Sequence, residues 1–328
     1  MATSTTTVPN AGPTAGSRSF LSRLRNGDEI ARIITFLFAA SVVILTVLIV
    51  LQLWHDSSLS RSKFGWSFFV KRVWDPTNDD FGALAFVYGT LVTSSIGLLL
   101  AVPFGLGAAI FLAELAPQKI SDTLQFFIDL LAAVPSVIYG LLGIFIVVPL
   151  MREYVQPALK GTLGFLPLFQ GPPFGIGFLT AGIVLAIMVI PYIISVSREV
   201  LMSVPRDQRE AALALGSTRW ESTWKIVVPF ARSGIMGSIF LALARALGET
   251  MAVTMVIGNT PTISASLLSP GYSIAAVIAN DLPEASGIYL HALVELGLVL
   301  FAFTFLLNGF ARLLLVLTTQ KGSGMGHV

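Results

Sequence analysis

The feature that most constrains this chain is a series of apolar stretches that are each long enough to cross a lipid bilayer. The first covers residues 30–53, and an α-helix of about 20 residues spans the roughly 30 Å hydrocarbon core. The stretch is longer than the apolar part of a secretory signal peptide, and no small-x-small cleavage site follows it. It is therefore expected to remain in the protein as a membrane span.

Five further stretches have the same character. In chain order they cover 81–113, 124–149, 175–196, 234–257 and 288–317. The composition agrees, because 55% of the residues are hydrophobic and only 12% are charged, about half the charged fraction of soluble domains. The predicted fold class is all-α: a polytopic membrane protein whose six transmembrane helices form one domain over 30–317.

The segments outside these spans are short or polar. Residues 1–29 are rich in Ser, Thr, Gly and Pro and are predicted to be a disordered cytoplasmic tail, and 318–328 form a short C-terminal tail. Residues 54–80 mix basic and aromatic side chains, which settle together at the lipid headgroups, so a short interfacial helix is expected there. Nucleic-acid binding is the other interpretation of such a mix, but the basic residues are scattered along the chain rather than gathered in one patch.

The distribution of basic residues predicts the orientation of the six spans. Thirteen of the 20 Lys and Arg residues fall in the tails and the adjoining ends of the first and last spans (Arg32 and Arg312), in the 114–123 turn and in the segment 198–232, which we call the elbow. Six fall on the opposite side. Cytoplasmic loops carry the excess of Lys and Arg in membrane proteins. Both termini and the elbow are therefore expected in the cytoplasm, with the basic group at 61–72 as the exception.

The elbow is the one long stretch that is both charged and helical in pattern. Pro205 suits a first helical turn, because its missing N–H would lack an intrahelical partner there. Gly216 is expected just past the helix end, in the left-handed conformation that glycine adopts at least cost. Thr218 and Glu221 have the spacing of a capping box, so a second helix is expected to start at once and to run to Pro229. Two helices joined by a sharp bend form a surface to which a partner protein can bind.

Two charged residues lie within the fifth predicted span. Arg245 and Glu249 are four residues apart, which places them on one face of a continuous helix and within pairing reach. A planar guanidinium matches a tetrahedral oxyanion, so Arg245 is a candidate for substrate contact, with the pair acting as a gate. The alternative, given equal weight, is that the two charges neutralise each other and lock helices together.

Three other ionisable residues are assigned structural roles. His291 and Glu295 are expected to form an interhelical hydrogen bond rather than a proton relay, and Asp129 is expected to cap a helix or reach the interface. The chain holds no Cys, its three His lack metal-ligand spacing, and it has neither a Walker lysine pattern nor a nucleophile with a base. No metal site, bound cofactor or enzymatic activity is therefore expected.

The elbow also contains a longer motif that resembles a known family. In order, it consists of Glu210-Ala211-Ala212, three residues, Gly216, nine residues and Ile226-x-Val228-Pro229. This pattern resembles the EAA loop of bacterial ABC-importer permeases, with Val228 where leucine is usual. The segments 74–76, 81–83, 88–90, 244–253 and 257–260 resemble the phosphate-importer permeases of the PstC type, and Ala85 stands where that family has proline.

The resemblance covers nearly the whole chain after the N-terminal tail, and it implies an ABC type I importer permease fold. The implied function is that of a transmembrane subunit in an ATP-driven importer of inorganic phosphate, located in a bacterial cytoplasmic membrane. The implied partners are a sister PstA-type permease, a PstB-type ATPase dimer that holds ATP and Mg, and a PstS-type phosphate-binding protein. The resemblance associates Arg245 and Glu249 with phosphate passage. It associates four elbow residues with ATPase docking: Glu210, Ala211, Ala212 and Gly216.

Other functions are weighed against this one. Within the importer class, the chain could be the sister PstA-type subunit or a permease for another oxyanion. A passive channel would need no elbow for an ATPase. An intramembrane enzyme would need a polar constellation inside the spans, such as paired aspartates or a Ser–Lys dyad, and none is evident.

Overall fold

Helices dominate the structure, a computed structural model that describes residues 28–320. Six of the described helices are long and apolar enough to cross a membrane, which confirms the all-α, six-span fold class. The chain forms two compact units, Met1–Gln52 and Leu53–Val328. Helix α2 (Asp28–Asp56) makes up the described part of the first unit, and its last turn belongs to the second.

The predicted tails, 1–29 and 318–328, lie almost wholly outside the described residues. Of these, 28–29 begin α2 and 318–320 end the last helix, α16 (Gly287–Gln320).

The second unit opens with short elements where a single interfacial helix was predicted. They are α3 (Ser58–Phe64), α4 (Ser67–Val70) and the antiparallel strands β1 (Trp74–Asp75) and β2 (Asp80–Phe81). The register pairs Trp74 with Phe81, and both rings pack edge-on, with their centroids 4.8 Å apart. Phe64, Phe68 and Phe81 are buried. These three aromatic side chains therefore pack against one another.

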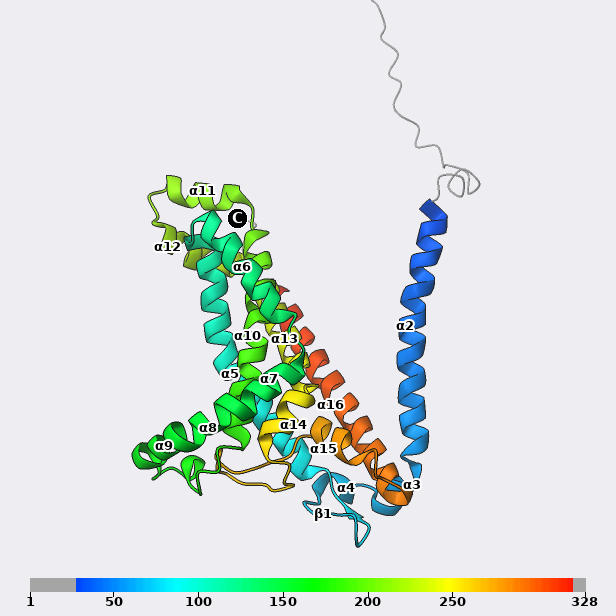
Figure 1. Ribbon diagram of the computed structural model, residues 1–328. Coiled ribbons are helices and arrows are strands. Elements are labelled where there is room, and N and C mark those ends of the chain that lie inside the picture. The colour runs from blue at the N-terminus through cyan, green and yellow to red at the C-terminus, as the bar shows by residue number, and fades with distance from the viewer. Residues whose placement is uncertain (1–27, 321–328) are drawn as a thin grey trace, which may run out of the picture. The chain divides into compact units, whose positions relative to one another are not determined.

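The remaining elements form a helical bundle with a few short additions (Figure 1). They begin with α5 (Leu84–Ile110), its π-helical extension η1 (Phe111–Leu115) and α6 (Gln118–Ala132). A continuous helix follows, made of α7 (Ser136–Leu142), η2 (Gly143–Val147), α8 (Val148–Leu150), η3 (Met151–Val155) and α9 (Gln156–Leu163). After the 3-10 turn η4 (Pro167–Phe169) come α10 (Phe178–Met202) and α11 (Arg206–Ala214). A second continuous helix consists of α12 (Arg219–Ser222), η5 (Thr223–Val227) and α13 (Val228–Leu247), followed by α14 (Met251–Ile257), α15 (Ile274–Asp281) and α16.

The predicted third span, 124–149, is wrong at both ends. The helix long enough to cross a membrane is Ser136–Leu163, and α6 is a separate helix before it. Proline disfavours a helical conformation in the residue before it and lacks an N–H to continue the hydrogen bonding, so the helix breaks just before Pro135. Two later prolines lie inside the continuous helix, each next to a π-helical segment, η2 or η3. These π-helical segments allow the helix to continue past Pro149.

The predicted fifth span, 234–257, also differs from the structure. The continuous helix runs from Arg219 to Leu247, Gly248 caps it, and α14 follows as a separate short helix. The segment 258–287, between the fifth and sixth predicted spans, contains α15, whose Ser273 side chain accepts a hydrogen bond from the backbone N–H of Ala276 at the helix start. Periodicity and hydropathy miss such breaks, because the flanking residues are equally apolar on both sides.

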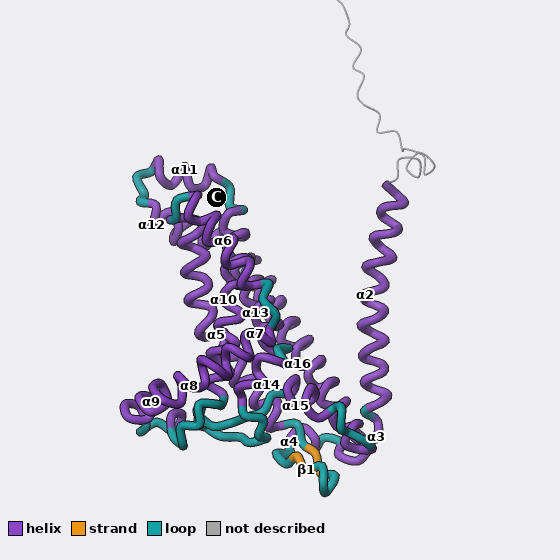
Figure 2. Tube along the Cα trace, in the orientation of Figure 1, coloured by secondary structure: helices purple, strands orange, loops and turns teal. Residues whose placement is uncertain are grey.

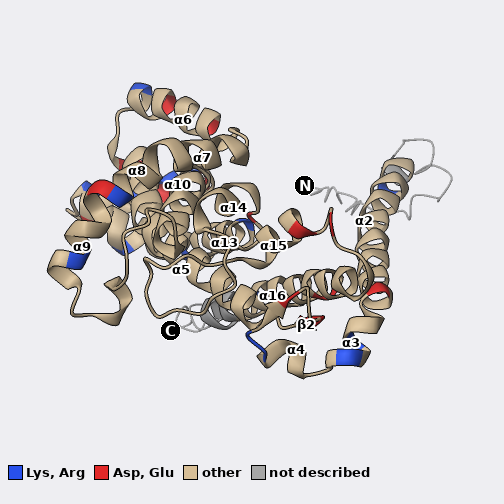
Figure 3. Ribbon diagram, turned by 60° about the horizontal axis from the view of Figure 1, so that its bottom comes forward, with Lys and Arg blue, Asp and Glu red and all other residues tan. Residues whose placement is uncertain are grey.

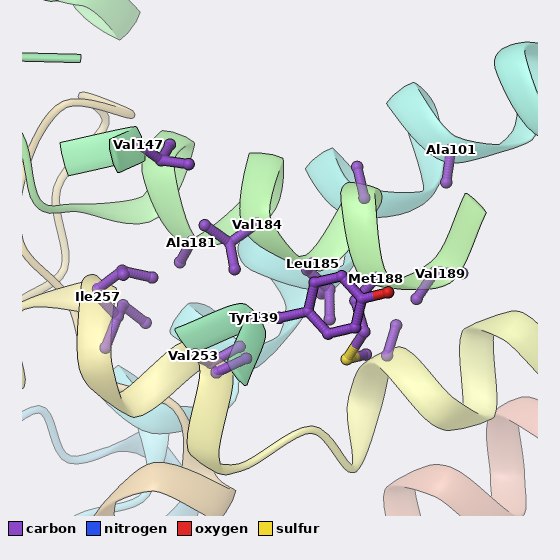
Figure 4. Packing of buried hydrophobic residues seen from close by; sticks show 14 of the residues in the cluster. Ala101, Tyr139, Val147, Ala181, Val184, Leu185, Met188, Val189, Val253 and Ile257 are labelled. Carbon is purple, nitrogen blue, oxygen red and sulfur yellow. The ribbon is translucent and has the colours of Figure 1, made fainter. Parts of the chain in front are cut away.

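Small residues allow the central helices of the bundle to approach closely. A Cβ added at Gly182 of α10 would lie 2.5 Å from Ile96 of α5, and one added at Gly89 would lie 2.0 Å from the carbonyl oxygen of Tyr272. Such contacts need glycine, because any side chain would push the helices apart. Around them lies the largest group of buried apolar side chains, to which Figure 4 shows α5, α7, α10 and α14 contributing, for example through Ala101 and Tyr139.

The two ends of the bundle differ in what they carry. The elbow helices α11 and α12 lie at one end, and α4, α15 and the hairpin lie at the other (Figure 1). The long connections are found mainly at the second end (Figure 2). Charged residues lie mainly at helix ends, in connections and on α6, while the long helices are mostly uncharged (Figure 3). Helix α10 ends beside the elbow, so a coupling site is expected at the elbow end of the bundle.

Candidate functional site

The first part of the candidate site is the bend of the elbow, which folds as its sequence predicts. Helix α11 begins directly after Pro205, and Gly216 follows its end with φ +87°, in the left-handed region. Thr218 Oγ1 accepts the backbone N–H of Glu221 at 3.2 Å, and the Glu221 carboxylate accepts the backbone N–H of Thr218 at 3.0 Å. This capping box starts the next helix two residues after the glycine. The bend is therefore fixed by local interactions.

The outer surface of the elbow is open in this chain. Ala212 is 2% exposed and packs inward, whereas Glu210 and Ala211 are exposed. Leu215, beside the bend, is 89% exposed. The face of the elbow that carries these residues is therefore accessible to a partner.

The ion pair that anchors the elbow was missed by the sequence reasoning. Arg209 of α11 binds Glu114 at the end of η1, with Nη2 2.8 Å from Oε1 and Nε 3.2 Å from both carboxylate oxygens. The same guanidinium donates to the carbonyl oxygens of Leu201 and Val204 at 2.7 and 2.5 Å. Arg209 thus binds carbonyls in and just after the last turn of α10 while it holds α11 to the end of the second span.

A second polar seam joins α10 to α6 near the elbow. Arg198 donates to Ser121 and also contacts Asp122, with Nη2 3.1 Å from Oδ1. About one turn earlier on α10, Ser195 donates to Asp129 at 2.6 Å. Asp129 was expected to cap a helix or reach the interface, but it accepts hydrogen bonds that link two helices. Partners more than 60 residues apart leave no local signal in a sequence.

One helix connects the elbow to the charged residues of the fifth span. The predicted end of the second elbow helix at Pro229 is wrong, because that proline lies in the first turn of α13, where its missing N–H costs little. The chain is helical from Arg219 to Leu247. Sixteen residues separate Pro229 from Arg245, which is about 24 Å at the rise of an α-helix. One continuous helix, which begins just after the bend, therefore leads to Arg245.

The predicted pairing of Arg245 with Glu249 does not occur in the structure. Helix α13 ends at Leu247, so Glu249 lies in the break before α14 and not on the same helical face. Its Oε1 accepts the backbone N–H of Ala252 at 3.1 Å, which satisfies a free donor at the start of α14. Among the described residues, the ion pairs do not include one for Arg245 or Glu249. The gate hypothesis loses its geometric basis, while a role for either residue in transport stays a prediction.

The surroundings of Arg245 are aromatic rather than acidic. Its side chain is exposed in this chain, and its guanidinium carbon lies 6.0 Å from the centroid of the Tyr192 ring on α10. The neighbours Ala244 and Gly248 line a pocket of about 470 Å³ against α16, but Arg245 does not. Arg245 thus forms no hydrogen bond or ion pair with the described part of the chain.

The other residues singled out from the sequence lie at the opposite end. His291 contacts the backbone oxygen of Asp56 through Nδ1, so it forms the expected interhelical hydrogen bond. Glu295 is 1% exposed and does not pair with His291; its Oε2 has no hydrogen-bond partner in residues 28–320. Within the same residues, no group of three or more His, Cys, Asp and Glu could hold a metal ion.

Comparison with known proteins identifies the family of the chain. A family model described as "binding-protein-dependent transport system inner membrane component" matches residues 101–316. The chain belongs to this family. It is a permease component of a transport system and not its catalytic subunit, and a permease of this kind works with separate ATPase and substrate-binding partners.

Relatives in several bacteria are similar to this permease over most of its length. A "phosphate transport system permease protein PstC" of Xylella fastidiosa is 46% identical over 320 residues, which cover 96% of this chain and 98% of the relative. Proteins of the same name from Pasteurella multocida and Haemophilus influenzae are 48% and 47% identical, covering 88% and 87% of this chain and 91% and 92% of their own. The family resemblance stated from the sequence is thereby confirmed.

Solved structures agree on the fold of the permease. A bacterial alginate ABC transporter, in complex with an alginate-bound periplasmic protein, aligns with a TM-score of 0.56 at 15% identity, covering 88% of this chain and 96% of its own. The inward-facing MetNI methionine ABC transporter aligns with a TM-score of 0.51 at 15% identity, covering 70% and 94%. At such low identity the alignments show the fold alone, which is that of an ABC-importer permease.

Proposed function

We propose that this chain is the transmembrane permease subunit of an ATP-driven importer that moves inorganic phosphate across a bacterial cytoplasmic membrane. The observation that carries the proposal is the single helix that links an open elbow to the unpaired Arg245. The substrate comes from the PstC relatives, which are 46% identical over nearly the whole chain. Both termini and the elbow face the cytoplasm in this proposal, as the excess of Lys and Arg predicts.

The proposed partners follow from the same reasoning. A PstB-type ATPase dimer grips the exposed face of the elbow, which includes Glu210 and Ala211, with Gly216 shaping the bend and Ala212 packing the elbow inward. A sister PstA-type permease pairs with this chain, and a PstS-type protein delivers phosphate from outside. ATP and Mg are held by the ATPase, and this chain binds no cofactor.

The mechanism follows from rigid connections. Closure of the ATPase dimer pushes the elbow, and Arg209 transmits this push to α10 and to the end of η1 through its bonds to Leu201 and Glu114. The helix from Arg219 to Leu247 moves with the elbow as a rod. Rigid-body rocking of α10 and α13 then changes the side from which Arg245 is reached, which is alternating access.

Uptake measurements test this proposal. In cells that lack this chain, we expect radiolabelled phosphate uptake to be restored by the wild-type permease, with sulfate and molybdate competing weakly. Arg245→Gln leaves a shorter, polar side chain and removes the positive charge and the guanidinium fork, so it should abolish uptake while the complex still co-purifies. Normal phosphate uptake by this variant would reduce Arg245 to a structural role, and preferential uptake of sulfate or molybdate would refute the proposed substrate.

A further inference from the structure

We infer that Tyr192 is a positioning residue for Arg245, and that its ring holds the guanidinium ready for a passing oxyanion. The inference rests on the proposed function and deepens it, because it names the group that orients the proposed anion contact. Tyr192 lies on α10 and Arg245 lies near the end of α13, two helices that pack against each other.

Arg245 needs such a group because no other residue fixes its side chain. Its guanidinium forms no hydrogen bond or ion pair with the described residues. Glu249, the carboxylate nearest in sequence, is engaged with the backbone N–H of Ala252. A long arginine side chain without partners samples many rotamers, and ordering it at the moment of substrate binding weakens that binding.

Tyr192 is well placed to restrict this motion. Its ring centroid lies 6.0 Å from the guanidinium carbon of Arg245, within the range of a cation–π interaction. The flanking residues Pro191 and Ile193 are buried, which fixes this turn of α10 against its neighbours. The Tyr192 hydroxyl has no hydrogen-bond partner in residues 28–320, so the ring is not held by its hydroxyl elsewhere.

An aromatic ring suits this task better than a carboxylate would. The negative face of the ring attracts the guanidinium through its quadrupole and carries no net charge. Arg245 therefore keeps its full positive charge for an incoming anion, whereas a carboxylate would neutralise it and repel the same anion. The other tyrosine in this region, Tyr139 of α7, is 6% exposed and donates its hydroxyl to the carbonyl of Leu131 at 2.7 Å, so it is committed to packing.

Two variants of Tyr192 separate the ring from its hydroxyl. In proteoliposomes that hold the complete complex, Tyr192→Leu should raise the KM for phosphate by roughly 3- to 30-fold, the loss expected for a cation–π contact, with little change in kcat or in basal ATP hydrolysis. Tyr192→Phe keeps the ring and should retain a KM close to that of the wild type. Tyr154→Leu is the matched control, because Tyr154 is 66% exposed and has no ring or hydrogen-bond contact in the described part of the chain.

The outcomes distinguish this inference from the proposed function. A wild-type KM in Tyr192→Leu, or a Tyr192→Phe variant as defective as Tyr192→Leu, would overturn the positioning role while phosphate transport stands. If the wild-type complex transports sulfate or molybdate instead of phosphate, the proposed function fails. The positioning role is then tested by comparing the KM for that anion between the wild type and the two Tyr192 variants, with the same outcomes overturning it. If the complex transports none of the three anions, both are refuted.

Discussion

The ion pair between Arg209 and Glu114 offers the sharpest test of how the elbow is held. The Arg209 side chain is 20% exposed and that of Glu114 is 9% exposed. Replacing Arg209 with Met keeps an unbranched, helix-forming side chain, but it leaves a nearly buried carboxylate unpaired and removes the hydrogen bonds to the carbonyls of Leu201 and Val204. We therefore expect Arg209→Met to destabilise the fold more than Glu114→Gln does.

The magnitudes follow from burial. Breaking a fully buried ion pair costs about 3–5 kcal/mol, and the partial exposure of Arg209 reduces this to about 3 kcal/mol for Arg209→Met. Glu114→Gln leaves Arg209 bound to the two carbonyls at the end of α10 and should cost about 1–2 kcal/mol. The double variant removes both charges, so its cost should fall below the sum of the single costs by about 1–2 kcal/mol.

Thermal unfolding of the detergent-solubilised protein measures these costs. Trp220 and Trp224 lie just after the bend, with ring centroids 5.6 Å apart, and their fluorescence reports the elbow. At roughly 2–4 °C per kcal/mol for a chain of a few hundred residues, Arg209→Met should lower the Tm by about 6–12 °C. Arg206→Met, an exposed position on the same helix, is the matched control and should leave the Tm unchanged. Equal effects of the two single changes, or strict additivity in the double variant, would refute a coupled pair.

Two further predictions concern the bend and the hairpin. Gly216→Val places a β-branched residue at φ +87°, which costs about 1–3 kcal/mol of strain, so it should weaken co-purification with the ATPase. Gly216→Asn should be better tolerated, because Asn adopts the left-handed conformation more readily. Unchanged co-purification and transport of the valine variant would contradict this prediction. The pKa of Asp75 is lowered chiefly by the Asn78 side-chain amide at 2.6 Å and also by the backbone N–H of Thr77. Its contribution to stability is therefore present at neutral pH and is lost as the pH falls through that lowered pKa. Proteolysis of the hairpin should increase at about pH 3 relative to neutral pH in the wild type and change less with pH in Asp75→Ala; an equal increase in both would argue against this role.

The local features of the elbow could be predicted from the sequence because neighbouring residues decide them. The positive φ of Gly216 and the reciprocal hydrogen bonds of Thr218 and Glu221 depend on residues within one turn of each other. The number of membrane spans could be predicted for a similar reason, since each span must satisfy its own backbone and bury its own apolar length in lipid. These requirements do not depend on what packs beside the helix.

The boundaries of the spans were predicted less well, because several breaks have no hydropathic signal. Apolar residues flank both the break before Pro135 and the break after Leu247. Pro135 sets the break between α6 and α7, whereas the break after Leu247 lets α14 pack against α7 and α10. The sequence prediction assumed one continuous helix through Gly248 and therefore placed Glu249 on the same face as Arg245. The helix ends before Gly248, so the predicted pair does not form.

The sequence by itself therefore determined that this protein spans the membrane six times and carries a bent coupling segment, because hydropathy and capping are properties of adjacent residues. Only the tertiary structure decided which charges meet. Arg209 binds Glu114 across 95 residues, and Tyr192 rather than Glu249 lies beside Arg245. The physical reason is that a charge in a low-dielectric bundle takes the nearest available partner in space, and the packing of whole helices sets which groups are near.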